Sequence, residues 1–155
     1  MATIKITTNI KQIQQAFAKA PGLTERRIQG AINLSGIEVR RLMKSEVPKK
    51  SGKLMRSIQA IPGKFKVRIG PNLTDAPHAI FVALGTKAHI IKPRNKKALW
   101  WTGAQHPVKL VHHPGTQPNP YVDRTAIKAQ PVVSKIFRLS LQQLMKDISV
   151  RWLLA

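Results

Sequence analysis

Three short apolar runs within residues 79–120 form the clearest pattern in the chain. In one-letter code they lie within AIFVALGT, AHIIKPRNKKALWW and PVKLVHHPGTQPNP, and Gly, Pro and Asn residues separate them. Runs of this length that are rich in Val, Ile, Phe and Trp and bounded by turn residues predict strands of an antiparallel sheet. We therefore expect a small sheet with its connecting loops in the middle of the chain.

A hairpin is predicted immediately before this stretch. Residues 54–61 and 65–69 flank the turn signal Pro62-Gly63-Lys64. In the second of these segments apolar and basic residues alternate along the chain. Because successive side chains of a strand point to opposite faces, we expect one face to be buried and the other to be positively charged.

Apolar residues at helical spacing precede the predicted sheet. They predict a helix over residues 10–20, which Pro21-Gly22 should stop, and a longer helix over residues 24–47. Pro48 should end the longer helix, because the residue before a proline avoids helical angles. Residues 3–7 alternate between apolar and polar, which predicts a short strand or an arm.

A further helix is predicted after the central stretch. Asn119 is placed to cap it, Pro120 to open it, and a broad apolar face extends to about residue 149. Pro131 lies inside this pattern and should kink or split the helix. The fold class that these elements predict is α+β, with an antiparallel sheet of about four to five strands packed against two to three helices in a single domain.

The charge of the chain is extreme. Its 155 residues hold 27 Lys and Arg against 6 Asp and Glu, a formal net charge of +21. The excess is concentrated in residues 47–122, which hold 13 basic residues and one acid, Asp75. Such a charge predicts association with a polyanion, either nucleic acid, an anionic membrane surface or an acidic protein. Since the basic residues occupy predicted loops and carry no base-reading motif, sequence-independent phosphate contact is favoured.

Enzymatic and metal chemistry are disfavoured. The chain has no cysteine, which excludes disulfides and thiolate metal sites. Its five histidines form no metal-binding motif, and the six scattered acids suggest no carboxylate pair. A hydrolase built on the histidines is therefore the least favoured hypothesis, and we expect no cofactor. No signal peptide and no membrane span is predicted, so we expect a protein made in a cytosol that does not enter a membrane.

Trp100 and Trp101 lie close to Lys96 and Lys97, the one cluster of aromatic and basic residues. Single-stranded nucleic acid is often bound by stacking on aromatic side chains in a positive groove. On a flat strand, however, consecutive residues point to opposite faces, so we expect only one tryptophan to face outward and the other to fill the core. A free-standing nucleic-acid-binding module is therefore the alternative hypothesis.

Four motifs occur in an order and spacing that resemble a known family. They are PKKSGKLMRSI at 48–58, AIFVALGT at 79–86, IKPRNKKALWW at 91–101 and VHHPGTQPNPYVDRTA at 111–126. This order resembles the head–tail joining and tail-completion (neck) proteins of long-tailed bacteriophages, relatives of minor tail protein Z. The resemblance covers residues 48–126, between the helices predicted over 10–47 and 120–149. The residues that match the family pattern are Gly52, Gly85, Thr86, His113, Pro114, Gly115 and Pro120.

The resemblance implies a non-enzymatic virion protein that forms a ring, commonly a hexamer, at the head–tail junction. Its implied partners are the head-completion or connector protein, the tail terminator or tail tube, and genomic double-stranded DNA bound without sequence specificity. Tail terminator and head-completion roles are alternatives within this class. Basic residues of the loops would line the DNA channel or face an acidic neighbouring ring; the candidates are Lys49, Lys50, Lys53, Arg56, Lys92, Arg94, Lys96 and Lys97.

Two apolar segments are candidates for contacts between subunits of such a ring. The strand predicted over residues 3–7 presents Ile4 and Ile6, which suits strand addition. The apolar C-terminal tail presents Trp152, Leu153 and Leu154, which suits packing against a neighbour. Both assignments follow from the expectation of a ring.

Overall fold

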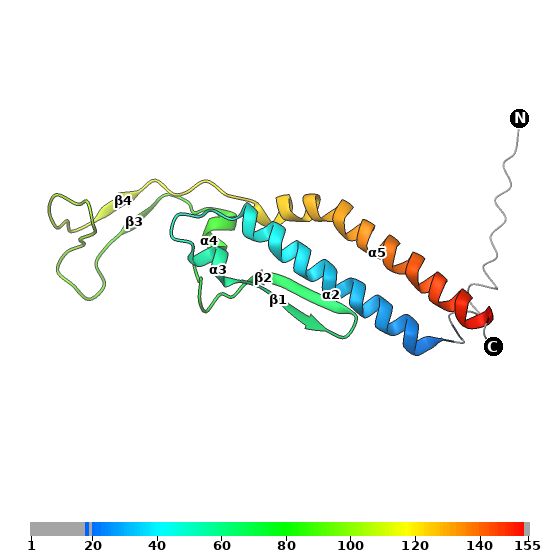
Figure 1. Ribbon diagram of the computed structural model, residues 1–155. Coiled ribbons are helices and arrows are strands. Elements are labelled where there is room, and N and C mark those ends of the chain that lie inside the picture. Colours follow the sequence, from blue (N-terminus) through cyan, green and yellow to red (C-terminus); the bar gives the residue numbers. More distant parts are fainter. Residues whose placement is uncertain (1–17, 19, 154–155) are drawn as a thin grey trace, which may run out of the picture.

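The computed structural model describes residues 18 and 20–153, with side chains described as far as residue 149. Two long helices, α2 (Pro21–Glu46) and α5 (Tyr121–Leu153), lie side by side in antiparallel orientation (Figure 1). A hairpin of β1 (Ile58–Gly63) and β2 (Lys66–Pro71) lies along α2. The short helices α3 (Lys53–Ser57) and α4 (Ala79–Leu84) cluster at the end of the helix pair where α2 ends and α5 begins.

A second ribbon projects from that same end. Strands β3 (His89–Ile91) and β4 (Val111–His113) pair antiparallel and extend away from the helices (Figure 1). The described residues thus contain two separate two-stranded antiparallel sheets, β1–β2 and β3–β4. The expected sheet of four to five strands is therefore wrong, although the strands that do form are antiparallel.

The run at residues 79–84 forms helix α4 instead of the expected strand. An apolar run of six residues is too short for its period to distinguish helix from strand. Here Ala79, Val82 and Ala83 pack against the core, and their spacing of three and four residues is that of a helix face. The remaining apolar side chains of α4, those of Ile80, Phe81 and Leu84, are exposed. Packing of Ala79, Val82 and Ala83 against the core therefore favours the helical conformation of residues 79–84.

Two further expected strands are shortened. Residues 53–57 form the single-turn helix α3, because Gly52 adopts a φ of +70° and its carbonyl accepts a hydrogen bond from the Arg56 amide at 3.0 Å. Around residues 98–101 only Leu99 pairs, in an isolated bridge with Val108. The hairpin prediction itself is confirmed, with β1 and β2 paired from Ile58↔Pro71 to Gly63↔Lys66.

The helix boundaries differ from expectation at prolines. Pro21, expected to stop a helix, occupies the first turn of α2, where a proline loses no hydrogen bond. Helix α5 begins at Tyr121, directly after Pro120, and it is not split at Pro131. Pro131 has no N–H to donate to the carbonyl of Ile127, and this carbonyl lies on an exposed turn of the helix. The helix expected over residues 10–20 and the strand over 3–7 lie outside the described residues.

The core lies where α2, α3, α4 and the start of α5 converge. Its buried cluster consists of Met43, Val47, Leu54, Ile58, Ala76, Ala79 and Tyr121. Along the rest of the helix pair, small residues such as Ala31 and Ala129 are buried between the helices. Against the hairpin, Gly36 permits direct contact, because a Cβ at this position would lie 2.7 Å from Cγ2 of Val67.

The hairpin is fixed to α2 at its turn. The side chain of Gln29 accepts a hydrogen bond from the Phe65 amide at 2.8 Å and donates one to the Gly63 carbonyl at 3.2 Å. Along β2, Val67 and Ile69 are half-buried whereas the basic residues between them are exposed. The expected alternation of buried and positive faces is therefore confirmed for the strand, but Phe65 belongs to the exposed turn.

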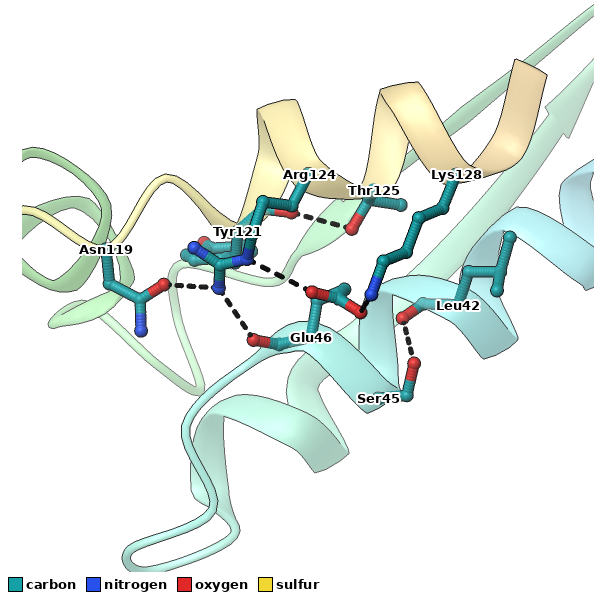
Figure 2. A network of polar contacts seen from close by, with 8 residues as sticks. All are labelled: Leu42, Ser45, Glu46, Asn119, Tyr121, Arg124, Thr125 and Lys128. Carbon is teal, nitrogen blue, oxygen red and sulfur yellow. Dashed lines mark hydrogen bonds and ion pairs between the residues drawn. The ribbon is translucent and has the colours of Figure 1, made fainter.

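The carboxylate of Glu46, at the C-terminal end of α2, joins the two long helices (Figure 2). It accepts hydrogen bonds from Nζ of Lys128 at 2.6 Å and from Nε of Arg124 at 3.1 Å. The same guanidinium donates to the Glu46 backbone carbonyl at 3.2 Å and to Oδ1 of Asn119 at 2.6 Å. The charged groups of α5 thus satisfy a carbonyl that the end of α2 leaves without a helical partner.

These contacts make stability depend on pH. The hydrogen bonds from Lys128 and Arg124 hold the pKa of the Glu46 carboxyl below its ordinary value of 4.5. A depressed folded-state pKa contributes stability above the unfolded value and loses it as the pH falls through the folded value. We expect Glu46→Gln to lower the Tm at neutral pH, with the difference from wild type shrinking as the pH falls below 4.5.

Thermal unfolding from neutral pH to about pH 3 measures this difference. The matched control is Glu38→Gln, which removes the same charge from an exposed pair with Arg41 on α2. We expect the control to change Tm little at any pH, since exposed ion pairs contribute little. A Glu46→Gln deficit that stays constant across the whole pH range contradicts the ionic origin of the effect.

Candidate interaction surface

Residues 85–118 form a projecting arm that contains β3 and β4 (Figure 1). At its base, Thr86 and Thr116 exchange two backbone hydrogen bonds, each with an N···O distance of 3.0 Å. Their hydroxyl oxygens also lie 3.0 Å apart. The Asn119 amide donates to the Val82 carbonyl at 3.0 Å, which ties the chain beyond the arm to α4. The base of the arm is therefore firmly attached to the helical body.

Two glycines allow the strands to approach at this base. Gly85 has a φ of +72° and Gly115 a φ of +90°, both in the region that favours glycine. A Cβ on Gly85 would lie 2.5 Å from the Thr116 carbonyl oxygen, and one on Gly115 would overlap the Thr86 carbonyl oxygen. We call Gly85, Thr86, Gly115 and Thr116 the clasp.

A pair of histidines lies next to the clasp. The rings of His89 and His113, directly opposite one another on β3 and β4, stack with their centroids 5.0 Å apart. Nδ1 of His113 accepts a hydrogen bond from the Gly115 amide at 3.0 Å, and Nδ1 of His89 donates to the Lys87 carbonyl at 2.8 Å. Both imidazoles thus hold the backbone at the start of the ribbon, which is a structural role.

Beyond the ribbon the chain closes into a tip of residues 98–108. Leu99 and Val108 exchange backbone hydrogen bonds of 2.8 and 2.9 Å. The Ala104 amide donates to the Trp101 carbonyl at 2.9 Å, and Gly103 lies inside this turn with a φ of +98°. Trp100 and Trp101, directly after the Leu99 bridge, are 66% and 50% exposed. The expectation that one tryptophan fills the core is therefore wrong.

The arm has no core of its own. No residue from 85 to 118 is buried. Leu99, Val108 and Val111 are half-buried, and five large apolar side chains of the arm are exposed, namely those of Ile90, Ile91, Trp100, Trp101 and Leu110. A lone two-stranded ribbon is only marginally stable in water. Its composition is that of a surface that another molecule covers.

The charge of the arm has one sign. It carries six basic residues and no acid, and all six are exposed: Lys87, Lys92, Arg94, Lys96, Lys97 and Lys109. The ion pairs that form among the described residues all lie on α2 and α5. Nothing in the described part of the chain therefore neutralises the arm.

The structure divides the basic residues that the sequence singled out. Lys92, Arg94, Lys96 and Lys97 lie on the outer part of the arm, between β3 and the tip. Lys49, Lys50, Lys53 and Arg56 lie instead on α3 and the loop before it, beside the base of the arm (Figure 1). Of these, Arg56 donates a hydrogen bond to the Ser51 carbonyl at 3.3 Å. The eight basic residues expected to act together therefore lie on two separate surfaces.

The expected subunit contacts fall at the edge of the described residues or beyond it. Ile4, Ile6 and Leu154 lie outside them, and Trp152 and Leu153 belong to the last turn of α5. The structure shows another apolar surface that the sequence interpretation missed. Phe137, Leu141 and Met145 line an open hollow of about 860 Å³ on α5. Their spacing of four residues was the signal in the sequence that could have revealed this surface.

Three of the five histidines lie around one hollow. His78, His89 and His113 line a hollow of about 420 Å³ between α4 and the clasp. No carboxylate lines this hollow. Within residues 18 and 20–153, no group of three or more metal-ligating side chains is placed to hold an ion. In the same described part, no helix has the length and apolar character that crossing a membrane requires.

Comparisons of the chain with protein-family models, with curated proteins and with solved structures find no match.

The clasp should be sensitive to a single methyl group. In Gly85→Ala the new Cβ meets the Thr116 carbonyl oxygen, and the positive φ adds strain of about 1–3 kcal/mol. We expect hydrogen exchange at the Thr86 and Thr116 amides to accelerate tenfold or more, since each ~1.4 kcal/mol is one factor of ten.

Gly103→Ala is the matched control, because its φ is +98° but nothing lies within 4 Å of a new Cβ. This variant introduces the same backbone strain at the tip but no steric overlap, so the amides of the clasp should exchange as in wild type. Unchanged exchange in Gly85→Ala contradicts the close approach of the two backbone segments.

Proposed function

We propose that this chain is a structural virion protein of the head–tail junction of a long-tailed bacteriophage. In this proposal, copies of the chain form a ring of tail-completion (neck) type that joins the capsid connector to the tail around the path of the DNA. It performs no catalysis. The motif order in residues 48–126 supports this assignment, and so do the following properties of the fold.

The observation that carries the proposal is the balance of exposed and buried apolar side chains. Among the described residues, 18 large hydrophobic side chains are exposed, against 11 buried hydrophobic residues, four of which are alanines. Scattered exposed apolar residues are normal, but an excess over the core is typical of a subunit that is completed by its neighbours. Ring formation would cover such surfaces.

The distribution of these residues supports at least two contact regions. One is the α5 surface of Phe137, Leu141 and Met145, which lies on the half of α5 remote from the arm (Figure 1). The other is the arm, together with the exposed residues of α4 at its base. We assign the α5 surface to contacts between copies and the arm to the next component along the DNA path.

The net charge of +21 supports a polyanionic environment. Copies of such a chain repel one another unless DNA phosphates or an acidic neighbouring ring offset their charge. The basic residues of α3 and its preceding loop, beside the base of the arm, suit the same environment. Partners in this proposal are the head-completion or connector protein on one side and the tail terminator or tail tube on the other.

A free-standing nucleic-acid-binding module is the second candidate. The exposure of both tryptophans at the tip favours it. The two candidates differ in mass, since the neck assignment requires a closed ring and the free-standing module does not. Cryo-electron microscopy of virions that contain the chain would test its position directly, with density at the junction expected.

Light scattering after size exclusion, at moderate salt, should give a ring of the full-length 17.3 kDa chain, six copies being the expected number. Leu141→Asp with Met145→Asp should dissociate it by at least a hundredfold in affinity. Each buried side chain of this size is worth roughly 1.5–3 kcal/mol, and the new charges would be buried unpaired.

Gln130→Asp with Ser149→Asp is the control, because it adds the same charge at exposed positions of the same helix. It should leave the ring intact, and circular dichroism should show equal helix content in both variants. A monomeric wild-type chain contradicts the ring, and a ring that survives Leu141→Asp with Met145→Asp contradicts the α5 interface.

A further inference from the structure

We infer that the tip of the arm is a binding surface for single-stranded nucleic acid. Trp100 and Trp101 would stack on unpaired bases, and Arg94, Lys96 and Lys97 would contact the phosphates. This inference does not rest on the neck assignment, because it follows from the exposure and closure of the tip and from the charge of residues 94–97, which lead into it.

The exposure of both tryptophans is the first argument. On a continuous strand one of two consecutive side chains would face inward. Here the strand-like pairing is limited to Leu99 and Val108, and a turn from Trp101 to Ala104 follows. The indoles of Trp100 and Trp101 therefore do not alternate between two faces of a strand, and they are 66% and 50% exposed. Two large aromatic side chains in water are unfavourable unless a ligand covers them.

The closure of the tip is the second argument. The Leu99–Val108 hydrogen bonds and the turn from Trp101 to Ala104 fix the backbone on both sides of the tryptophans. Leu99, Ala104 and Val108 of the tip are half-buried, whereas Trp100 and Trp101 are exposed. A surface held in place before binding loses less conformational entropy when a ligand binds.

Charge identifies the class of ligand. The arm carries six basic residues and no acid, which suits a polyanion. A second copy of the chain is a poor partner for it. Glu38, Glu46 and Asp147, half of the six acids, are already in ion pairs on the helices.

Aromatic side chains then select among polyanions. In a duplex the base faces are stacked on one another and offer the indoles no surface except at the ends. Unpaired bases expose both faces, and stacking on aromatic side chains together with phosphate contacts is the usual mode of single-strand binding. A single strand uses both components of the tip, whereas a duplex uses only the charge.

The test is binding of a labelled oligo(dT) of roughly 16 nucleotides to the full-length chain, followed by fluorescence anisotropy over a range of salt. Trp100→Ala with Trp101→Ala should weaken binding about tenfold or more, and the salt dependence should stay as in wild type. Trp100→Phe with Trp101→Phe should retain most of the affinity, since phenylalanine also stacks. This rescue separates loss of stacking from collapse of the loop.

Lys96→Gln with Lys97→Gln should act differently. Removing two phosphate contacts should lower the slope of log K against log salt by about 1.4, because each contact to a single strand contributes about 0.7. Lys64→Gln with Lys66→Gln removes the same net charge from exposed positions of the β1–β2 hairpin, away from the tip, and should leave the slope within experimental error of wild type.

Several results would overturn the inference. One is a duplex of equal length that binds as tightly as oligo(dT), with no effect of the tryptophan substitutions. Another is binding to anionic phosphatidylserine vesicles that depends on Trp100 and Trp101 while oligo(dT) does not bind, which assigns the tip to a membrane surface. Absence of both activities assigns it to a protein partner. Light scattering tests the ring independently of this binding experiment. A chain that is monomeric but binds oligo(dT) through the tryptophans would therefore contradict the ring and support the inference about the tip.

Discussion

The ionic contact of Glu46 with Arg124 and Lys128 is the constraint on which the arrangement of the molecule depends. It joins the last turn of α2 to the first turns of α5. The same Arg124 holds Asn119, the residue that follows the arm and leads into α5. One carboxylate therefore fixes the crossing of the helices and the position from which the arm leaves. In a chain with 27 basic and 6 acidic residues, two of the few acids, Glu46 and Asp147, hold α2 to α5.

The sequence predicted those parts of the fold whose signals are local. Pro48 marked the end of α2 correctly, and the β1–β2 hairpin formed around its predicted turn. Helix α4 was missed because its choice between helix and strand is made by tertiary packing of Ala79 and Val82 on the core. With α3 and α4 helical, the strands that would have joined the two ribbons into one sheet do not exist.

The sequence predicted the basic and aromatic residues of the candidate site, but it did not predict how they are arranged in space. Composition located the excess charge between residues 47 and 122, and the structure shows where it divides, between the region of α3 and the outer arm. One tryptophan was expected to be buried because consecutive residues of a flat strand point to opposite faces. The strand pairing here is a single bridge at Leu99, so this rule does not hold for Trp100 and Trp101. No local pattern could reveal that the arm lacks a core, because burial depends on which segments lie beside one another.

The absence of a core makes the arm depend on what binds it. Its backbone pairing is limited to the clasp, the β3–β4 ribbon and the Leu99–Val108 bridge, with no buried side chain between them. A ligand that binds only the ordered arm stabilises it by mass action, so occupancy of the tip and order along the ribbon rise together. The α5 surface of Phe137, Leu141 and Met145 has no such dependence, because the helix pair beneath it is packed through Leu144 and Ile148. The proposed contacts between copies and the proposed contacts of the arm therefore use separate parts of the molecule, so that substitutions can test each of them without the other.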